Sequence, residues 1–270
     1  MSYYIWKSFI NLKNILSEYM DIIDQYFEKV NELLNKIKDN ERENIWKAAE
    51  LMANAIANGK LIHVIGPGGH SDIGAREMFC RAGGLVPIDA ILDPGWSLEH
   101  GAKRSTSIER TQGYALAVLK QYSLEKGDIL IITQPWGINS ICIDTALEAK
   151  RLGLIIIAIT SPEFSKKVPL EHPARHPSKK NLFEIADVVV NNYMPFEDAV
   201  LDIEGSPQKV SPVSTIVTAF TINCLVAATA KKLIEKGMQP PIWRSGNIPG
   251  GDEYNQEWFE KFKGKVKHLF

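Results

Sequence analysis

A cluster of glycines in the first third of the chain has the residue types of an anion-binding loop. The segment HVIGPGGHSDIGAREMF, residues 63–79, passes from an apolar run through three glycines into a helical pattern. Glycines let the backbone turn so that its N–H groups face inward, and a helix start adds the positive end of a dipole. The segment therefore predicts a cradle for a small oxyanion, contacted by Gly68, Gly69, His70 and Ser71.

The same loop has two other interpretations. A dinucleotide fingerprint, G-x-G-x-x-G, fits Gly66 and Gly68, and Asp89 follows at about the right distance for a ribose contact, but Ser71 replaces the third glycine. A tight strand-to-helix turn without a ligand is the second alternative. The incomplete fingerprint favours the small anionic ligand over a dinucleotide.

Proton transfer beside such a ligand requires a carboxylate or an imidazole. Glu77 follows the cradle by about two helical turns, and Glu109 opens a helix after an irregular loop. His176 lies in the loop segment HPARHPS. Glu77 could instead form an ion pair with Arg81, and His63, in mid-strand, is expected to be a core residue. The catalytic candidates are Glu77, Glu109 and His176.

These candidates must be positioned by alternating strands and helices. Five apolar runs are typical of buried strands, at 61–66, 86–92, 128–133, 154–160 and 186–192. A first helical pattern covers 17–38, and a second begins at a capping box of Asn40 and Glu43 and ends at Asn58. Further helical patterns cover 72–83, 107–122, 139–153 and 213–237. Strands that are apolar throughout and separated by helices indicate a parallel sheet covered on both faces. Irregular segments at 93–107 and 162–180 follow strand ends, where such sheets bind ligands.

The pattern predicts three regions. Residues 1–58 are N-terminal helices that pack on the domain or on a partner subunit, residues 59–238 form an α/β domain, and residues 239–270 form a loop and helix that complete it. A net charge of −1 gives no electrostatic footprint for nucleic acid or an anionic membrane. No apolar run approaches the roughly 20 residues of a membrane span. Three widely spaced cysteines suit a reducing compartment, so we expect a cytoplasmic protein.

Several segments, taken in order, resemble those of sugar isomerase (SIS) domain proteins. GPGGHSDIGAREMFCRAGGL (66–85) resembles their first ligand loop and is most similar to an uncharacterised subgroup with a G-H-S…E…R-A-G-G-L pattern. The segments at 107–115, 127–161, 176–192, 209–220 and 245–255 also match, so the resemblance covers roughly residues 40–265. It implies a three-layer αβα sandwich with a five-stranded parallel sheet, sites near a subunit interface, and binding of a sugar phosphate, often with aldose–ketose isomerisation.

The turn after the third predicted strand departs from this family. SIS proteins usually carry a Ser-x-Ser-Gly type turn whose hydroxyls hold the phosphate, whereas this chain has Gln134-Pro135-Trp136-Gly137. An indole can stack on a sugar or donate one hydrogen bond, but it cannot replace two hydroxyls. Three alternatives follow: other groups hold the phosphate, another anion such as a sulfonate replaces it, or the ligand lacks a phosphate. The hydroxyls that could compensate belong to Thr133, Ser140, Ser214 and Thr215.

The resemblance also implies the rest of the site. Phosphoheptose isomerases, which are more distantly similar, place a metal-binding His and Glu on the helix after the cradle. Arg76 and Cys80 stand at those positions here, so we expect no metal, and no cofactor. The further substrate-binding candidates are Arg110, Gln134, Trp136, Gly137, Asn139, Ser214, Thr215 and Asn247.

The expected function is therefore that of an SIS isomerase. It would act on a phosphorylated or otherwise anionic sugar through an enediolate, as a homodimer or higher homo-oligomer without nucleic-acid or membrane partners. Two alternatives stay open: a non-catalytic module that binds a sugar phosphate, and a lyase or etherase acting on a sugar acid derivative.

Overall fold

The computed structural model describes residues 20–270 of the chain. The beginning of the predicted 1–58 region and of the predicted helix 17–38 lies outside the described residues. The helices are α2 (Ile22–Asn40), α3 (Arg42–Ala57), α4 (Asp72–Met78), α5 (Ala102–Glu109), α6 (Tyr114–Leu119), α7 (Ser140–Leu152), α8 (Pro162–Lys167), α9 (Leu182–Ile185), α10 (Ser214–Glu235) and α11 (Gly251–Phe262), with short 3₁₀ turns η1 (Leu98–His100) and η2 (Lys267–Leu269).

The five predicted strands form one parallel sheet. They are β1 (Ile62–Ile65), β2 (Ile88–Ile91), β3 (Ile129–Thr133), β4 (Ile155–Thr160) and β5 (Val188–Asn191). Their spatial order is β2-β1-β3-β4-β5, and every pairing is parallel. The strand order reverses between β1 and β3, which is where open α/β sheets bind ligands beyond the carboxyl ends of the strands. The cradle follows β1 and the unusual turn follows β3, so both lie at this point.

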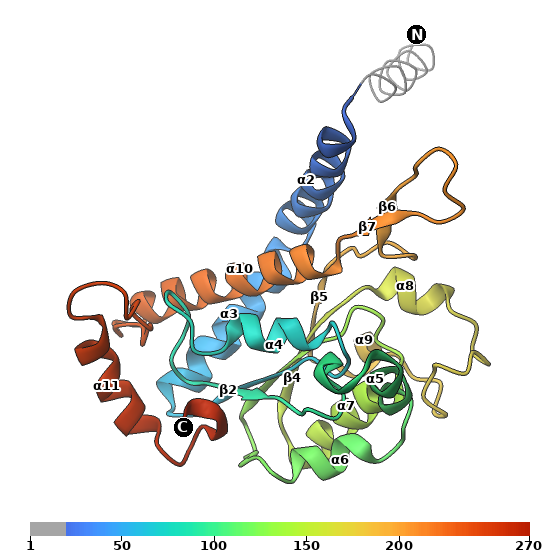
Figure 1. The fold of residues 1–270 in the computed structure, drawn as a ribbon. Helices are drawn as coiled ribbons and strands as arrows, with labels where there is room; N and C mark the ends of the chain where they lie inside the picture. The colour runs from blue at the N-terminus through green and yellow to red at the C-terminus, as the bar shows by residue number, and fades with distance from the viewer. Residues whose placement is uncertain (1–19) are drawn as a thin grey trace.

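Helices cover both faces of the sheet, as the apolar strands require. Alternate strand residues such as Ile129 and Ile131 pack with α3, α4 and α10, while Leu130 and Ile132 face α6, α7 and the start of α9. Figure 1 shows the two helical layers on either side of the strands. The predicted three-layer αβα sandwich is confirmed. Apolar residues of α2 and α3 share one core with the sheet, and the division at 58/59 and 238/239 stays a prediction.

Three local predictions are wrong. The helix expected at 72–83 ends at Met78, because Phe79 is extended and Cys80 has a positive φ of 41°. The helix expected at 107–122 is two helices, since Gly113 between them has φ 76°. The expected capping box is not formed, because Asn40 ends α2 and Glu41 precedes α3 without a side-chain cap.

Helix α10 has the length and the apolar composition that a membrane-spanning helix needs. Half of its most apolar stretch is buried inside the protein, and residues such as Val217, Leu225 and Leu233 pack in the core with α3. These contacts make α10 a core helix of the SIS-type sandwich. At its start it follows a small antiparallel pair, β6 (Ala199–Leu201) and β7 (Val210–Pro212).

Candidate functional site

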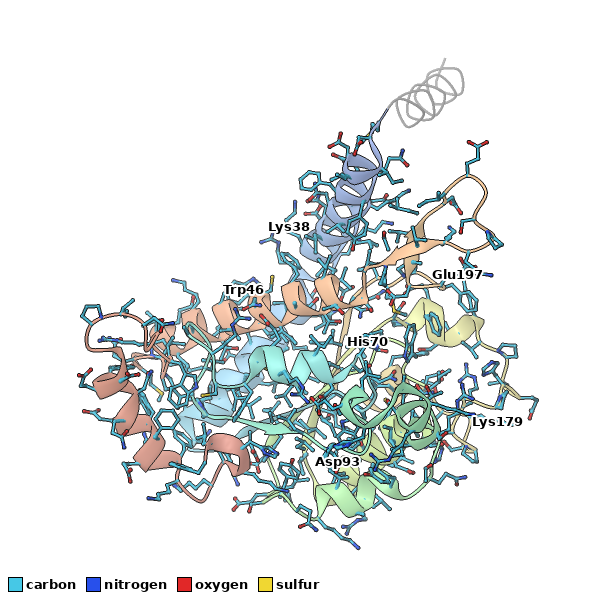
Figure 2. The ribbon with its side chains drawn as sticks, in the orientation of Figure 1. Lys38, Trp46, His70, Asp93, Lys179 and Glu197 are labelled. Carbon is cyan, nitrogen blue, oxygen red and sulfur yellow. The ribbon has the colours of Figure 1, made fainter. Side chains whose placement is uncertain are left out.

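A cavity of about 330 Å³ lies between the loop after β1, the turn after β3 and the start of α10. Figure 2 shows His70 at the head of α4, close to the start of α10. Several of the residues selected from the sequence are brought together here. The lining consists of His70, Ser71, Ile73, Gly74, Glu77, Glu109, Thr133, Pro135, Trp136, Asp198, Pro212, Ser214, Thr215, Thr218 and Ala219.

Glu109 is held in this cavity by the cradle itself. The N–H of Gly69 donates a hydrogen bond of 2.9 Å to Oε1 of Glu109. Burial raises the pKa of the Glu109 carboxyl above its ordinary value, while the Gly69 hydrogen bond and the charge of Arg110 act in the opposite direction. The arrangement produces a carboxylate that is a stronger base than one in water.

Glycine is required beside this carboxylate. Gly68 has φ 144°, and a Cβ added there would lie 2.8 Å from Oε1 of Glu109. A Cβ on Gly66 would lie 1.8 Å from the carbonyl oxygen of Ser71. The cradle glycines therefore allow the loop to close tightly on itself and on the side chain of Glu109.

Glu77 also lines the cavity, but its charge is shared with the protein. It forms an ion pair with Arg81, and it accepts a hydrogen bond of 2.8 Å from Nδ2 of Asn223. The predicted ion pair with Arg81 and a position on the cavity wall are thus both present. Within residues 20–270, Glu109 forms no ion pair and accepts a hydrogen bond from the Gly69 N–H, whereas Glu77 is paired with Arg81.

The turn after β3 is closed by its own side chain. Oε1 of Gln134 accepts a hydrogen bond of 2.6 Å from the N–H of Gly137, and Nε2 donates to Oδ1 of Asn139 at 2.9 Å. Gln134 is fully buried, and Asn139 in turn donates to the carbonyl of Ala174 at 3.1 Å. These predicted contact residues support the turn and do not line the cavity. Trp136 does line it.

Trp136 belongs to a row of aromatic rings. Its ring centroid lies 4.9 Å from that of Phe164, which stacks on Phe196 at 5.0 Å. Phe196 is half-exposed at the surface. The packing holds the Trp136 ring in one orientation at the wall of the cavity.

Asp198 is a lining residue that the sequence analysis did not select. Its Oδ1 accepts hydrogen bonds from the N–H groups of Val213 at 3.0 Å and Ser214 at 2.8 Å, and its Oδ2 accepts one from the Ser214 hydroxyl at 2.7 Å. It has a positive φ of 62°. The loop before β6 has no motif, so no local signal marked this residue as a cap for α10.

The cradle residues Gly68 and Gly69 are not lining residues, and three further candidates also lie outside the cavity lining. Nε2 of His176 lies 3.2 Å from Oδ1 of Asp144, and its Nδ1 lies 2.7 Å from the Ser178 hydroxyl, so its ring stabilises the loop after α8. Arg110 follows the end of α5 at the surface. Asn247 is exposed in the loop before α11, where its N–H donates to Ser245.

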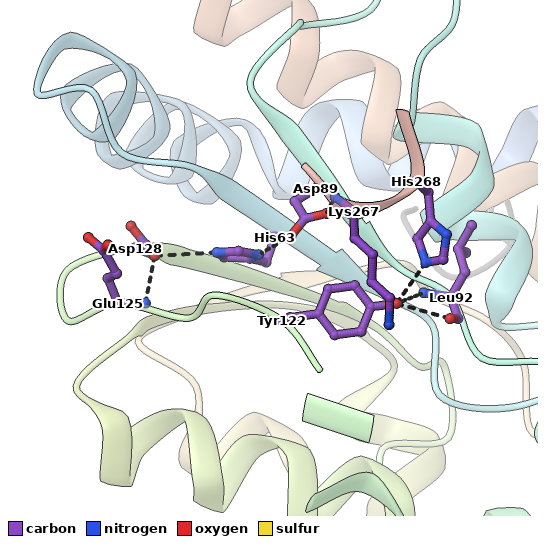
Figure 3. A network of polar contacts seen from close by, with 8 residues as sticks. All are labelled: His63, Asp89, Leu92, Tyr122, Glu125, Asp128, Lys267 and His268. Atoms are coloured by element: carbon purple, nitrogen blue, oxygen red, sulfur yellow. Dashed lines mark hydrogen bonds and ion pairs between the residues drawn. The ribbon is translucent and has the colours of Figure 1, made fainter. Parts of the chain in front are cut away.

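Asp89, the residue considered for a ribose contact, is buried inside the sheet. It is 1% exposed, and its Oδ2 lies 3.2 Å from Nδ1 of His63. Nε2 of His63 lies 3.3 Å from Oδ2 of Asp128, so the imidazole bridges two carboxylates (Figure 3). The other oxygen of Asp89 accepts from the N–H of Lys267 at 3.2 Å. Asp89 is therefore not placed to bind a ribose, which contradicts the dinucleotide interpretation.

Arg76, one of the two residues that the resemblance aligns with metal ligands, forms ion pairs with carboxylates of this chain. Nε of Arg76 lies 2.7 Å from Oδ2 of Asp72, and its Nη2 lies 3.2 Å from Glu99. Within residues 20–270, no group of three or more His, Cys, Asp and Glu side chains is arranged to hold a metal ion.

Comparison with known proteins identifies the family of this chain. The sequence profile of the SIS domain matches residues 25–161. The chain belongs to the SIS domain family. It is 39% identical over 248 residues to a UPF0309 protein of Geobacillus thermodenitrificans, covering 92% of this chain and 98% of the relative. A UPF0309 protein of Geobacillus sp. strain WCH70 is 40% identical over the same length, with the same coverage.

A solved structure shows the same fold. The phosphoheptose isomerase of Francisella tularensis matches with a TM-score of 0.51 and 17% identity, covering 78% of this chain and all of that chain. The predicted SIS membership, and the more distant likeness to phosphoheptose isomerases, are both confirmed. At this identity the likeness concerns the fold, and the chemistry of this SIS domain must be argued from its own cavity.

Proposed function

We propose that this SIS domain binds a sugar derivative in the 330 Å³ cavity and isomerises it between aldose and ketose, with Glu109 as the base. The observation that carries the proposal is the position of Glu109: it lines the cavity, its pKa is raised by burial, and the Gly69 N–H fixes one of its oxygens. Membership of the SIS (sugar isomerase) domain family supports this class of reaction.

The reaction moves one proton from the carbon next to the carbonyl to the carbonyl carbon, and a second proton from the hydroxyl of the first carbon to the carbonyl oxygen. Deprotonated Glu109 accepts the proton from the carbon next to the carbonyl and returns it to the former carbonyl carbon, which regenerates the carboxylate. Hydrogen-bond donors aimed at the two oxygens stabilise the intervening enediolate. His70, Ser71 and Thr215 line the cavity and are the donors that we assign to this step.

Deuterium exchange tests this reaction even when its product is unidentified. Sugars that bind are incubated with the protein in D₂O, and NMR follows the signal of the proton next to the carbonyl. Native protein should exchange it, while Glu109→Gln should slow exchange by roughly 10²–10⁴-fold, the range for loss of a general base. Glu99→Gln, an exposed carboxylate of η1, is the matched control and should exchange at the native rate. Equal rates for Glu109→Gln and native protein would contradict the proposal.

The raised pKa of Glu109 is also compatible with a second candidate reaction, elimination from a sugar acid derivative. Glu109 would take the proton next to the carbonyl and, once protonated, would pass that proton to the departing oxygen. In the same NMR samples elimination would release a free alcohol or acid together with an unsaturated sugar. A bound sugar with neither exchange nor release would identify a non-catalytic binding module.

We also propose that the protein is a homodimer or higher homo-oligomer. Helix α2 extends away from the sheet (Figure 1), and Ile23 and Phe27 on it are 75% and 60% exposed. Exposed apolar side chains grouped on one helix are typical of a surface that packs against another chain. Light scattering should give twice the monomer mass or more, and Phe27→Asp should lower it. A native monomer that persists at high concentration would refute this assembly.

A cytoplasmic location completes the proposal. All three cysteines lie within the described residues and are free, and burial raises the pKa of the Cys80, Cys142 and Cys224 thiols. Unpaired, protonated thiols suit a reducing compartment. Fractionation of the native organism's cells, probed with an antibody, tests the location.

A further inference from the structure

We propose that the cavity takes an uncharged sugar and discriminates against the phosphorylated form of that sugar. This inference rests on the proposed sugar-binding function of the same cavity, and it replaces the phosphorylated or otherwise anionic ligand expected from the sequence. Three independent features of the cavity carry it: the charge of its wall, the occupation of its N–H donors, and the nature of the groups that remain.

The wall of the cavity is acidic. Glu77, Glu109 and Asp198 contribute three carboxyl groups, of which Glu77 is paired with Arg81, and within residues 20–270 no lysine or arginine is among the lining residues. Among the described lining residues, His70 is the one histidine. A phosphate dianion placed here would be repelled at short range in a partly buried site, where such repulsion is poorly screened.

Three backbone N–H groups in the elements around the cavity already have side-chain partners from the protein. The Gly69 N–H of the cradle donates to Glu109, the Gly137 N–H of the β3 turn donates to Gln134, and the Ser214 N–H at the start of α10 donates to Asp198. These donors belong to three separate elements around the cavity. Because each of these N–H groups donates to a carboxylate or carboxamide oxygen of this chain, none of the three is available to a phosphate oxygen.

The remaining groups match a neutral polyol. Carboxylate oxygens accept hydrogen bonds from sugar hydroxyls, and the lining hydroxyls of Ser71, Thr215 and Thr218 can both donate and accept. The Trp136 ring, held by Phe164, offers an aromatic face to the apolar side of a sugar ring. Hydroxyls and a C–H face are what an uncharged sugar presents.

Matched pairs of ligands test the inference. Full-length native protein is screened by thermal shift, then by calorimetry, with D-glucose, D-fructose, D-mannose and N-acetyl-D-glucosamine, each beside its own 6-phosphate, and with inorganic phosphate. At least one free sugar should bind, with its 6-phosphate about 10-fold weaker or more. Trp136→Ala should weaken the binding of that free sugar. The affinity of native protein for the free sugar should change little with salt concentration, because an uncharged ligand adds no charge to the site. A 6-phosphate that binds as tightly as its parent sugar, or no binding by any pair, would overturn the inference.

Two variants examine the mechanism of discrimination. Gln134→Ser frees the Gly137 N–H, and Asp198→Gly removes one carboxylate and frees the Ser214 N–H while tolerating the positive φ at that position. Each variant is checked for folding by circular dichroism, and each should reduce the difference in affinity between the free sugar and its 6-phosphate. An unchanged gap in every folded variant would show that these groups do not set the selectivity.

The same samples separate failure of this inference from failure of the isomerase proposal. A free sugar that binds in preference to its phosphate but exchanges no deuterium leaves the inference standing and refutes the isomerase. A sugar phosphate that binds more tightly and exchanges deuterium overturns the inference and leaves the isomerase standing.

Discussion

Gly69 and Glu109 are joined by a hydrogen bond of 2.9 Å, from the backbone N–H of the loop after β1 to the carboxylate at the end of α5. The bond makes the cradle and the proposed base a single unit, although 40 residues separate them in the sequence. The cradle therefore has a different role from the predicted one, because the Gly69 N–H, expected to bind a ligand anion, binds the Glu109 carboxylate of the protein instead.

Activity should decline on the acid side at a pH higher than an ordinary glutamate would give. Glu109 must be deprotonated to act as a base, and burial raises its pKa while the charge of Arg110 partly offsets this. Removing that charge in Arg110→Gln should move the acid limb of the pH–rate profile to still higher pH. Lys103→Gln, an exposed cation on the same helix, is the control and should leave the profile in place. An unmoved limb in Arg110→Gln would show that another group limits the rate.

Replacing the proposed base should stabilise the fold. A carboxyl whose pKa is raised in the folded protein disfavours folding once the pH exceeds its unfolded pKa, so this cost is present at neutral pH and absent in acid. Glu109→Gln keeps an acceptor for the Gly69 N–H and should therefore raise Tm at neutral pH while abolishing turnover. The gain in Tm should vanish below the ordinary glutamate pKa; an equal gain at both pH values would contradict the electrostatic explanation.

Replacing Gly68 should reduce activity more than it reduces the stability of the fold. Gly68→Ala introduces a Cβ that meets Oε1 of Glu109, and it places a side chain at φ 144°. We expect kcat to fall by roughly 10²-fold or more because the base is displaced. Gly205→Ala, in the open β6–β7 loop with no neighbour within 4 Å, also places a side chain at a positive φ, 81°, and should retain kcat. Equal losses in the two variants would assign the effect to backbone strain alone.

His63 should contribute strongly to stability. Burial alone would lower the pKa of its imidazole, but contacts with Asp128 and Asp89 raise it above the ordinary histidine value. His63→Leu leaves two buried carboxyls without their partner and should cost about 3–5 kcal/mol in urea unfolding. His100→Leu, exposed on η1, should stay within about 0.5 kcal/mol of native protein.

The pH dependence of this contribution has a definite sign. Because the folded pKa of His63 is raised, the stabilisation by its charge is fully present below the unfolded histidine pKa and is lost as the pH rises through the folded value. Unfolding free energies measured at one pH below the first value and one above the second should show this loss in native protein. If the free energies of unfolding of native protein and His63→Leu differ by the same amount at both pH values, the imidazole is neutral at both.

Asp198 should stabilise the start of α10. Asp198→Gly removes the acceptor of three hydrogen bonds without straining the positive φ, and the loss of such a cap should cost about 1 kcal/mol in the free energy of unfolding. Asp202→Ala removes an exposed carboxylate near Lys209 from the neighbouring loop and should cost no more than about 0.5 kcal/mol. If the two substitutions cost the same, the cap would have no special role.

The sequence by itself determined the sheet and the tight turn after β1. Apolar runs and glycines act over a few residues, so they predicted these elements, whereas residue types left three catalytic candidates, Glu77, Glu109 and His176, without a choice between them. The tertiary structure alone decided which partners these residues meet. Asp198 reaches α10 from a loop without a motif, Gln134 folds back on its own turn, and His176 points to Asp144 instead of the cavity. Such contacts depend on the direction of each side chain and on distant segments packing together, and a pattern of residue types along the chain carries neither.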